Sequence, residues 1–141
     1  FMGFENERFV SSGLVTATVP HHPVIREMIE EYKKLSFNEL SQDMSAAACP
    51  YLNSGVLERF GLIRNGQEQI VSGIHIYPIE WFNPLDSATN KLNKTENTYS
   101  IHWYSMSWLP KSVRIRSAFT RLCRRLLGVH CFDSLKKLMH R

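Results

Sequence analysis

The basic residues of this chain are concentrated at its C-terminal end. Of the 17 Lys and Arg residues in the 141-residue sequence, nine lie in residues 111–141, together with one of the 13 acidic residues, Asp133. This segment has a formal charge of +8, whereas residues 1–110, with eight bases and 12 acids, have a charge of −4. Because the composition changes at Pro110, we predict a mildly acidic body, residues 1–110, and a basic tail, residues 111–141.

The remaining composition is that of an ordinary globular domain. The chain is 43% hydrophobic and 21% charged, and its length corresponds to about one domain with its own core. No run of about 18 apolar residues suggests a membrane-spanning helix. Three cysteines, an odd number, argue against a disulfide framework and favour a reducing compartment, so we expect a cytoplasmic protein. The sequence begins at Phe1 without an initiator methionine, and we expect truncation or processing to have produced this end.

Hydrophobic periodicity predicts helices at residues 23–35 and 111–127. The first begins at Pro23, whose missing N–H costs nothing in a first turn, and repeats apolar residues at helical spacing. The second is followed by Gly128, a typical helix stop. A shorter helix is expected over residues 53–61, capped by Asn53 or Ser54.

Extended segments are predicted at residues 8–19, 69–77 and 98–103, because β-branched and aromatic residues gather there. A Ser-Ser-Gly interruption at residues 11–13 predicts a turn or bulge within the first of them. Residues 36–50 are polar and then Ala-rich, and we expect them to form an exposed loop.

Residues near the end of the body carry the strongest candidates for chemistry. His102 ends a predicted strand among aromatic side chains. A neutral imidazole can bind a divalent metal, and hydroxyls in a following loop, here Ser105 and Ser107, can hold phosphate oxygens. Trp108 could stack on a planar ligand. A half-buried aromatic strand with a hydrogen-bonded histidine fits the same residues, so both interpretations stay open.

Several familiar catalytic patterns are missing from the sequence. It contains no Gly-rich phosphate loop, no Gly-x-Ser-x-Gly and no Cys-x-x-Cys. The Cys and His residues of the tail match no zinc-ligand spacing. Cys49 has no identifiable base beside it in the sequence, so we do not expect it to act as a nucleophile.

The predicted helix of the tail separates apolar from basic side chains. At about 100° per residue, its large apolar residues fall within about 80° of Phe119. Its arginines gather mainly on the opposite side, namely Arg114, Arg121, Arg124 and Arg125. Such a helix can lie on an anionic membrane surface, bind nucleic-acid phosphates, or pack on the body with its basic face in solvent. Nucleic acid is the least favoured partner, because few aromatic residues interleave with the arginines.

Five short blocks follow one another in an order that resembles a known family. They are residues 4–7 (Phe-Glu-Asn-Glu), 11–14 (Ser-Ser-Gly-Leu), 22–25 (His-Pro-Val-Ile), 73–78 (Gly-Ile-His-Ile-Tyr-Pro) and 96–102 (Glu-Asn-Thr-Tyr-Ser-Ile-His). The set ends in His-x-x-Ser-x-Ser-Trp, from His102 to Trp108. It resembles the latter half of the bacterial sugar transferases with an Asp-x-Asp motif, glycosyltransferase family 32 of the capsular and exopolysaccharide type. The resemblance covers roughly residues 1–110 and leaves the basic tail outside it.

The resemblance implies a fold, an activity and a site. The fold would be α/β of the GT-A type, a mixed sheet with flanking helices, with residues 1–110 as the C-terminal portion of the catalytic domain. The activity would be transfer of a sugar from a nucleotide-sugar donor to a glycan or lipid-linked acceptor. A separate hypothesis is that the basic tail holds the enzyme at the inner face of the bacterial cell membrane, near a lipid-linked acceptor. Mn²⁺ or Mg²⁺ would neutralise charge on the leaving diphosphate. His102 would bind this metal, and Ser105, Ser107 and Trp108 would approach the diphosphate.

The Asp-x-Asp motif itself is not in this sequence, whose aspartates are Asp43, Asp86 and Asp133. The resemblance therefore implies that the motif lies upstream, and we expect these 141 residues alone to be inactive or nearly so. Two other classes stay open. One is a non-catalytic carbohydrate- or partner-binding module that uses Trp81, Trp103 and Trp108. The other is a membrane-surface adaptor built around the basic helix.

Overall fold

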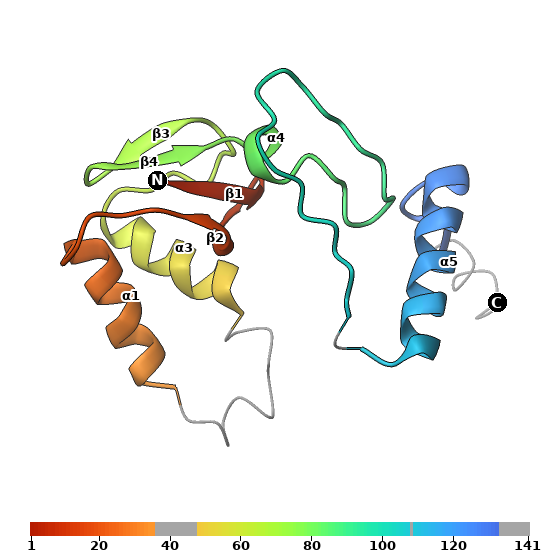
Figure 1. Ribbon diagram of the computed structural model, residues 1–141, viewed down its shortest axis with the longest axis horizontal. Coiled ribbons are helices and arrows are strands. Elements are labelled where there is room, and N and C mark those ends of the chain that lie inside the picture. The colour runs from red at the N-terminus through yellow and green to blue at the C-terminus, as the bar shows by residue number, and fades with distance from the viewer. Residues whose placement is uncertain (36–47, 108, 133–141) are drawn as a thin grey trace.

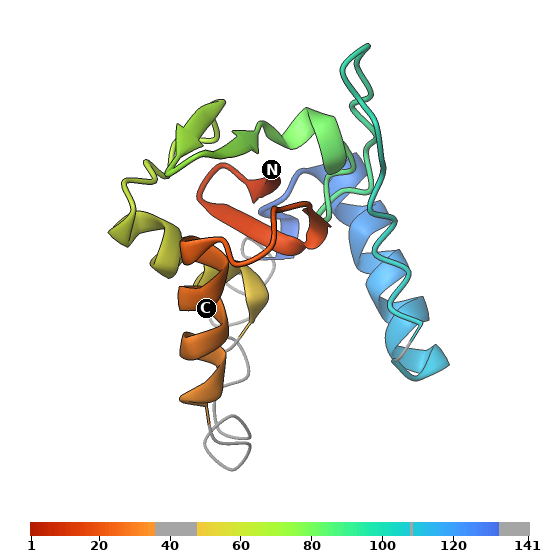
Figure 2. The ribbon, with the colours of Figure 1, turned by 60° about the vertical axis from the view of Figure 1, so that its left-hand side comes forward.

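The computed structural model describes residues 1–35, 48–107 and 109–132 (Figure 1). A four-stranded mixed sheet packs on a pair of helices, and a long C-terminal helix stands to one side (Figures 1 and 2). This arrangement confirms the predicted α/β class with a mixed sheet and flanking helices. Among the described helices, none is long and apolar enough to cross a lipid bilayer.

The sheet has the strand order β2-β1-β4-β3. Its strands are β1 (Met2–Asn6), β2 (Phe9–Thr16), β3 (Gln69–Val71) and β4 (Ile74–Tyr77). The central pair, β1 and β4, is parallel, and each outer strand pairs antiparallel with its neighbour. The carboxyl ends of β1 and β4 therefore meet at one edge of the sheet, which is where α/β folds commonly bind ligands.

The structure corrects one predicted strand and confirms an irregularity predicted in another. Residues 69–77 form a hairpin rather than one strand, because Ser72 and Gly73 both adopt positive φ, 46° and 83°, as a tight two-residue hairpin turn requires. In β2 the predicted irregularity is confirmed. Gly3 pairs with Ser11 and Met2 with Thr16, so the intervening residues of β2 bulge out of the ladder.

Each of the two body helices has a proline in its first turn. Helix α1 (Pro23–Lys33) is confirmed, with Pro23 in its first turn. Helix α3 (Cys49–Arg59) begins earlier than predicted, because Pro50 also fits a first turn and starts a helix where we expected a loop. Asn53 and Ser54 are therefore not caps. They lie inside α3 and are buried.

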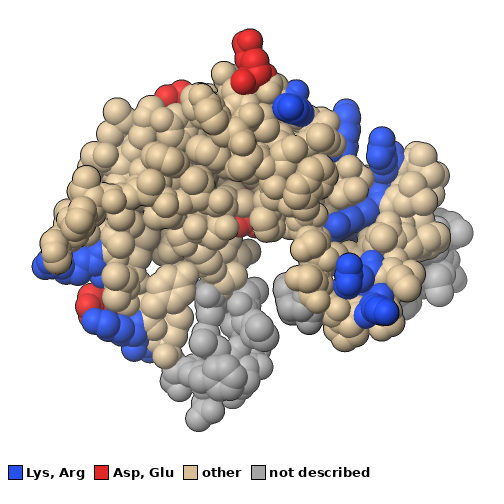
Figure 3. Space-filling model, viewed as in Figure 1, with Lys and Arg blue, Asp and Glu red and all other residues tan. Residues whose placement is uncertain are grey.

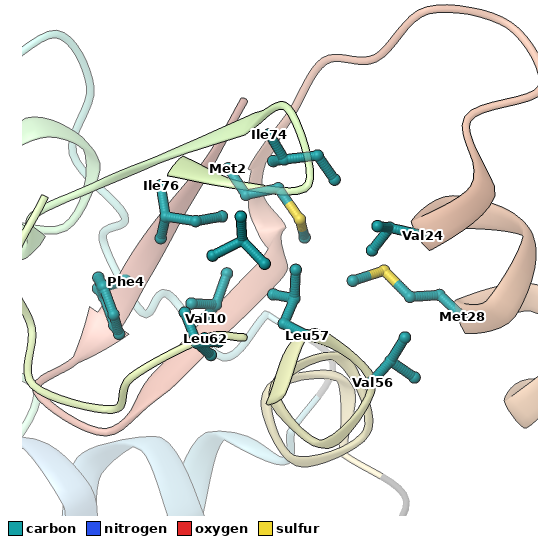
Figure 4. Packing of buried hydrophobic residues seen from close by; sticks show 11 residues of the cluster. Met2, Phe4, Val10, Val24, Met28, Val56, Leu57, Leu62, Ile74 and Ile76 are labelled. Carbon is teal, nitrogen blue, oxygen red and sulfur yellow. The ribbon is translucent and has the colours of Figure 1, made fainter. Parts of the chain in front are cut away.

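The hydrophobic core lies between the sheet and these two helices (Figure 4). The strands contribute Met2, Phe4, Val10 and Ile76, all fully buried. From the helices, α1 adds Val24 and Met28, and α3 adds Val56 and Leu57. The buried cluster therefore extends from Met2 to Ile76 in the sequence. Ile79 packs against it, and Phe82 and Leu85 are buried as well.

The chain beyond β4 is mostly irregular. It forms the short helix α4 (Ile79–Phe82) and then runs to α5 (Lys111–Leu127). The strand predicted over residues 98–103 is wrong, because the N–H groups of Tyr99 and Ser100 donate to the carbonyl of Trp81 instead of to a neighbouring strand. Helix α5 has the predicted bounds and is followed by Gly128, but none of its residues is buried.

Candidate functional site

A cavity of about 420 Å³ lies at the edge of the sheet where the parallel strands β1 and β4 end. Residues 5–7 at the end of β1 form one wall. The opposite wall is Ile79 and residues 83–88, which follow β4. Tyr104 joins them from the C-terminal segment. We call this cavity the Asn83 pocket, because Asn83 is the most buried polar side chain that lines it.

Asn83 presents a buried hydrogen-bond acceptor that lacks a partner. The residue is 3% exposed, and its Nδ2 donates to the carbonyl of Glu5 at 2.8 Å and to the hydroxyl of Tyr104 at 2.7 Å. Because a carbonyl can only accept, the bond to Glu5 fixes the orientation of the amide. Oδ1 is then left buried without a hydrogen-bond partner in the described part of the chain. Such an orphan costs about 1–3 kcal/mol.

Tyr104 supplies a donor beside this acceptor. Burial raises the pKa of Tyr104. The hydrogen bond from Asn83 lowers it in part and the nearby Glu5 carboxylate raises it again, so the net pKa lies above the ordinary value of 10.0. The phenol is therefore protonated at neutral pH and can donate to a ligand oxygen. Its backbone has a φ of 47°, a conformation that non-glycine residues seldom adopt outside structurally constrained sites.

The negative charge of the pocket restricts the ligands that it can bind. Glu5, Glu7 and Asp86 line it, and its described lining includes no Lys, Arg or His. A diphosphate would be repelled by these carboxylates. A neutral ligand with several hydroxyl groups would instead find acceptors at the carboxylates and at Asn83, and a donor at Tyr104. The arrangement therefore suits a sugar or a related polyol.

The structure brings only part of the predicted metal and diphosphate site to this pocket. The ring of His102, which is exposed, meets Tyr104 edge-on with the ring centroids 4.3 Å apart. His102 thus lies next to a residue of the pocket wall. Ser105 and Ser107 are exposed and do not line the pocket, and Trp108 lies outside the described residues.

The described residues do not complete a site for a divalent cation. Within residues 1–35, 48–107 and 109–132, no group of three or more His, Cys, Asp or Glu side chains could hold a metal ion. Mn²⁺ and Mg²⁺ prefer several oxygen ligands, and His102 alone offers one nitrogen. Its assignment to the metal stays a prediction, and no step below depends on a metal ion.

A second polar cluster surrounds Cys49, a residue that we do not expect from the sequence to act as a nucleophile. Its Sγ lies 2.8 Å from Ser12 Oγ and 3.0 Å from Asn53 Nδ2. Burial raises the pKa of the Cys49 thiol, but hydrogen bonds from Ser12, Ser11, the Gly13 N–H and Tyr32 together lower it more, so the net pKa lies below the ordinary 9.0. Burial, and next the Cys49 charge, raise the pKa of Tyr32 to about 12. The cluster links α1, β2 and α3, and only folding brings these distant residues together.

Trp81 and Trp103, which the binding-module alternative would use, have different surroundings. Trp81 stacks with Tyr77 and with Tyr99, at centroid distances of 4.4 and 5.4 Å. Its ring therefore already has two aromatic neighbours, which leaves less of it for a ligand. Trp103 is 63% exposed. A carbohydrate platform that uses these tryptophans together stays a prediction.

Another cavity, of about 460 Å³, lies beside the start of α1 and is lined by residues 18–22 and one side of that helix. Here His22 is already engaged, because its Nδ1 accepts the N–H of Val24 at 3.3 Å and caps α1. We place the candidate site at the Asn83 pocket, since only there does the sheet topology coincide with a buried, unpartnered acceptor among the described residues.

Comparison of the chain with protein-family models, with curated proteins and with solved structures gave no significant match. The resemblance to the sugar transferases therefore stays a prediction, and so does the division at Pro110 into a catalytic portion and a tail.

Proposed function

We propose that this chain is the sugar-binding portion of a GT-A type transferase, which moves a sugar from a nucleotide-sugar donor to a glycan or lipid-linked acceptor. The observation that carries the proposal is the acidic pocket at the ends of two parallel strands, beside which Asn83 keeps an unpartnered Oδ1. A sugar hydroxyl could accept from Tyr104, whereas Oδ1 is shielded from solvent in this structure. Oδ1 becomes available to a sugar hydroxyl only when the side chains that cover it move.

The acidic lining also fits the chemistry of an acceptor sugar. A hydroxyl that attacks an anomeric carbon must lose its proton, and a carboxylate within hydrogen-bond reach can receive it. Asp86 Oδ1 already accepts the N–H groups of Ala88 and Thr89, each at 2.8 Å, which shapes the loop. Of the other two carboxylates, Glu7 is exposed and Glu5 is partly buried, so we assign Glu5 to orienting the sugar. The donor diphosphate binds outside this negatively charged pocket.

The family resemblance points to the same place in the fold. The block at residues 4–7 provides the β1 wall of the pocket, and the block at 73–78 contains β4, which leads to the opposite wall. The block at 96–102 directly precedes the segment that carries Tyr104. The first of these blocks thus lines the pocket, and the other two lie close in sequence to residues that line it.

Binding of sugars by the full 141-residue chain tests the proposal. Saturation-transfer NMR with a panel of monosaccharides and nucleotide sugars is expected to show contact with the sugar ring. Tyr104→Phe removes one donor and is expected to weaken binding about two- to tenfold. Tyr99→Phe is the matched control, because Tyr99 is 77% exposed and does not line the pocket. Equal weakening in both variants, or no sugar binding at all, would contradict the proposal.

A comparison of binding to nucleotide sugars and to the free sugars separates the enzyme from a non-catalytic binding module. If nucleotide sugars bind more tightly than the free sugars, a donor site is present, and the transferase is supported. If free sugars bind as well as their nucleotide derivatives, a carbohydrate-binding module explains the pocket better. We expect no turnover by this chain alone, because it lacks an Asp-x-Asp motif, and metal-dependent turnover would overturn that expectation.

A further inference from the structure

We propose that α5 docks on an anionic membrane surface with its apolar face against the lipid. None of the residues from Lys111 to Leu127 is buried. Five large apolar side chains on this helix are more than half exposed, namely Ile115 (70%), Phe119 (63%), Leu122 (52%), Leu126 (73%) and Leu127 (74%). Because water-soluble surfaces seldom gather so many large apolar side chains in one patch, this face is an interaction surface.

The helix turns a polar side toward the rest of the chain. The partly covered residues of α5 are Val113, Ser117, Thr120, Arg121, Cys123 and Arg124. At about 100° per residue, all of them except Cys123 lie about 100° or more from Phe119. The guanidinium of Arg121 lies 3.9 Å from Met106 Sδ, and Nε of Arg124 is buried without a partner among the described residues. A helix that served to extend the core of the body would present the opposite face. Its orientation therefore keeps the apolar face available to a partner.

The charge of α5 identifies this partner as anionic. The helix carries Lys111, Arg114, Arg116, Arg121, Arg124 and Arg125 and no acidic residue. Lys and Arg side chains lie over its visible surface with no acidic side chain among them (Figure 3). When an amphipathic helix lies in a membrane interface, its apolar side chains enter the acyl boundary and long basic side chains reach to the phosphates. Phospholipid headgroups of negative charge complement this surface.

The alternatives fit less well. Nucleic acid would engage the arginines through phosphates but leave the apolar face in water. A second copy of the chain would cover the apolar face but bring two sets of basic residues together, and like charges repel. At 17 residues, α5 is about 25 Å long, and a helix with six basic residues lies in the plane of the membrane rather than across it.

Vesicle flotation of the full chain tests this proposal, with pure phosphatidylcholine compared with phosphatidylcholine that contains a quarter phosphatidylglycerol. We expect binding to the anionic vesicles, weakened by high salt because ions screen surface charges. The double variant Phe119→Ser/Leu126→Ser is expected to bind at least about tenfold more weakly. Arg114→Gln/Arg125→Gln is expected to bind about 25-fold more weakly, since each basic residue near such a surface contributes about fivefold.

Matched variants on the body keep the test specific. Ile63→Ser/Ile70→Ser removes two side chains that are 65% and 71% exposed there, and Arg8→Gln/Arg26→Gln removes the same charge from exposed positions. Both are expected to bind like the wild type. Because no α5 residue is buried, the α5 variants should also unfold at the wild-type temperature, which excludes misfolding as a cause.

Three outcomes would overturn the proposal. The first is flotation that is unchanged in Phe119→Ser/Leu126→Ser. The second is equal binding to neutral and anionic vesicles. The third is the absence of vesicle binding together with a concentration-dependent dimer that the same double variant dissociates, which would assign the apolar face of α5 to a second copy of the chain.

Discussion

Helices α1 and α5 share an amphipathic sequence pattern but end in different environments. Both carry apolar residues at helical spacing on one side and charged residues on the other. In α1 the apolar residues Val24 and Met28 are buried in the core, whereas in α5 no residue is buried. The periodicity of apolar residues therefore specifies a helix but does not specify what covers its apolar face.

The charged residues of the two helices differ more than the apolar ones. In α1, Glu30 pairs with Lys33 at 2.8 Å, and Glu31 pairs with Lys34 at 2.9 Å. Arg59 of α3 reaches Glu31 at 2.8 Å, so charge also joins the two body helices. In contrast, α5 has six bases and no acid. This difference is what the proposed docking of α5 on an anionic surface requires.

The largest expected difference between the body helices and α5 is in the cost of truncating a leucine. Leu57 of α3 is fully buried, whereas Leu126 of α5 is 73% exposed. Leu57→Ala leaves a cavity in the core and is expected to lower the free energy of unfolding by about 2–5 kcal/mol. Leu126→Ala should change it by less than about 0.5 kcal/mol. Urea unfolding followed by tryptophan fluorescence measures both, and similar losses would show that α5 packs on the body.

Two serines, Ser54 in α3 and Ser117 in α5, allow the same comparison of the body with α5, with a smaller expected effect on stability. Ser54 Oγ accepts the N–H of Val10 at 2.8 Å inside the body, so Ser54→Ala leaves that buried N–H unpaired, at a cost of about 1–3 kcal/mol. Ser117 lies in α5, where alanine is the better helix former by about 0.5 kcal/mol. Ser117→Ala is therefore expected to be neutral or slightly stabilising. Thermal unfolding of the two variants checks the prediction, and a loss at Ser117 equal to that at Ser54 would contradict it.

The sequence predicts local elements well where a residue acts through its own backbone. Pro23 marks the start of α1 and Gly128 marks the end of α5, because their conformational preferences are local. Predictions from the sequence fail where contacts with residues distant in the chain determine the conformation. Residues 98–103 have the composition of a strand, yet their N–H groups at Tyr99 and Ser100 meet the carbonyl of Trp81. The hairpin at Ser72 and Gly73 could have been recognised from its turn chemistry.

The candidate site shows the same division between local and distant information. His102 is conspicuous in the sequence, and the structure places it beside Tyr104. Asn83 carries no sequence signal of its own, because its importance arises from bonds to Glu5 and Tyr104 across 78 and 21 residues. The Asn-Pro pair at residues 83–84 resembles an ordinary turn. A buried acceptor without a partner can be found only after the chain has folded.

The smallest expected difference concerns charge. Arg59→Gln removes the link from α3 to Glu31 on α1, whereas Arg114→Gln removes an exposed charge of α5. Hydrogen bonds from Lys34 and then from Arg59 hold the pKa of Glu31 below its ordinary 4.5. A carboxylate with a lowered pKa contributes stability that is present above the unfolded pKa and is lost as pH falls through the folded pKa.

The destabilisation by Arg59→Gln should therefore be measurable at pH 7 and remain smaller than that of Ser54→Ala. It should shrink as the pH falls below about 4.5, the ordinary glutamate value, toward the lower pKa of Glu31 in the folded chain. Part of the Glu31 effect persists in this variant, because Lys34 still pairs with it. Arg114→Gln is expected to show no pH-dependent difference from the wild type. Thermal unfolding across this pH range measures both variants. If Arg114→Gln lost stability with the same pH dependence, α5 would have an acidic partner on the body, and the contrast between the two kinds of helix would fail.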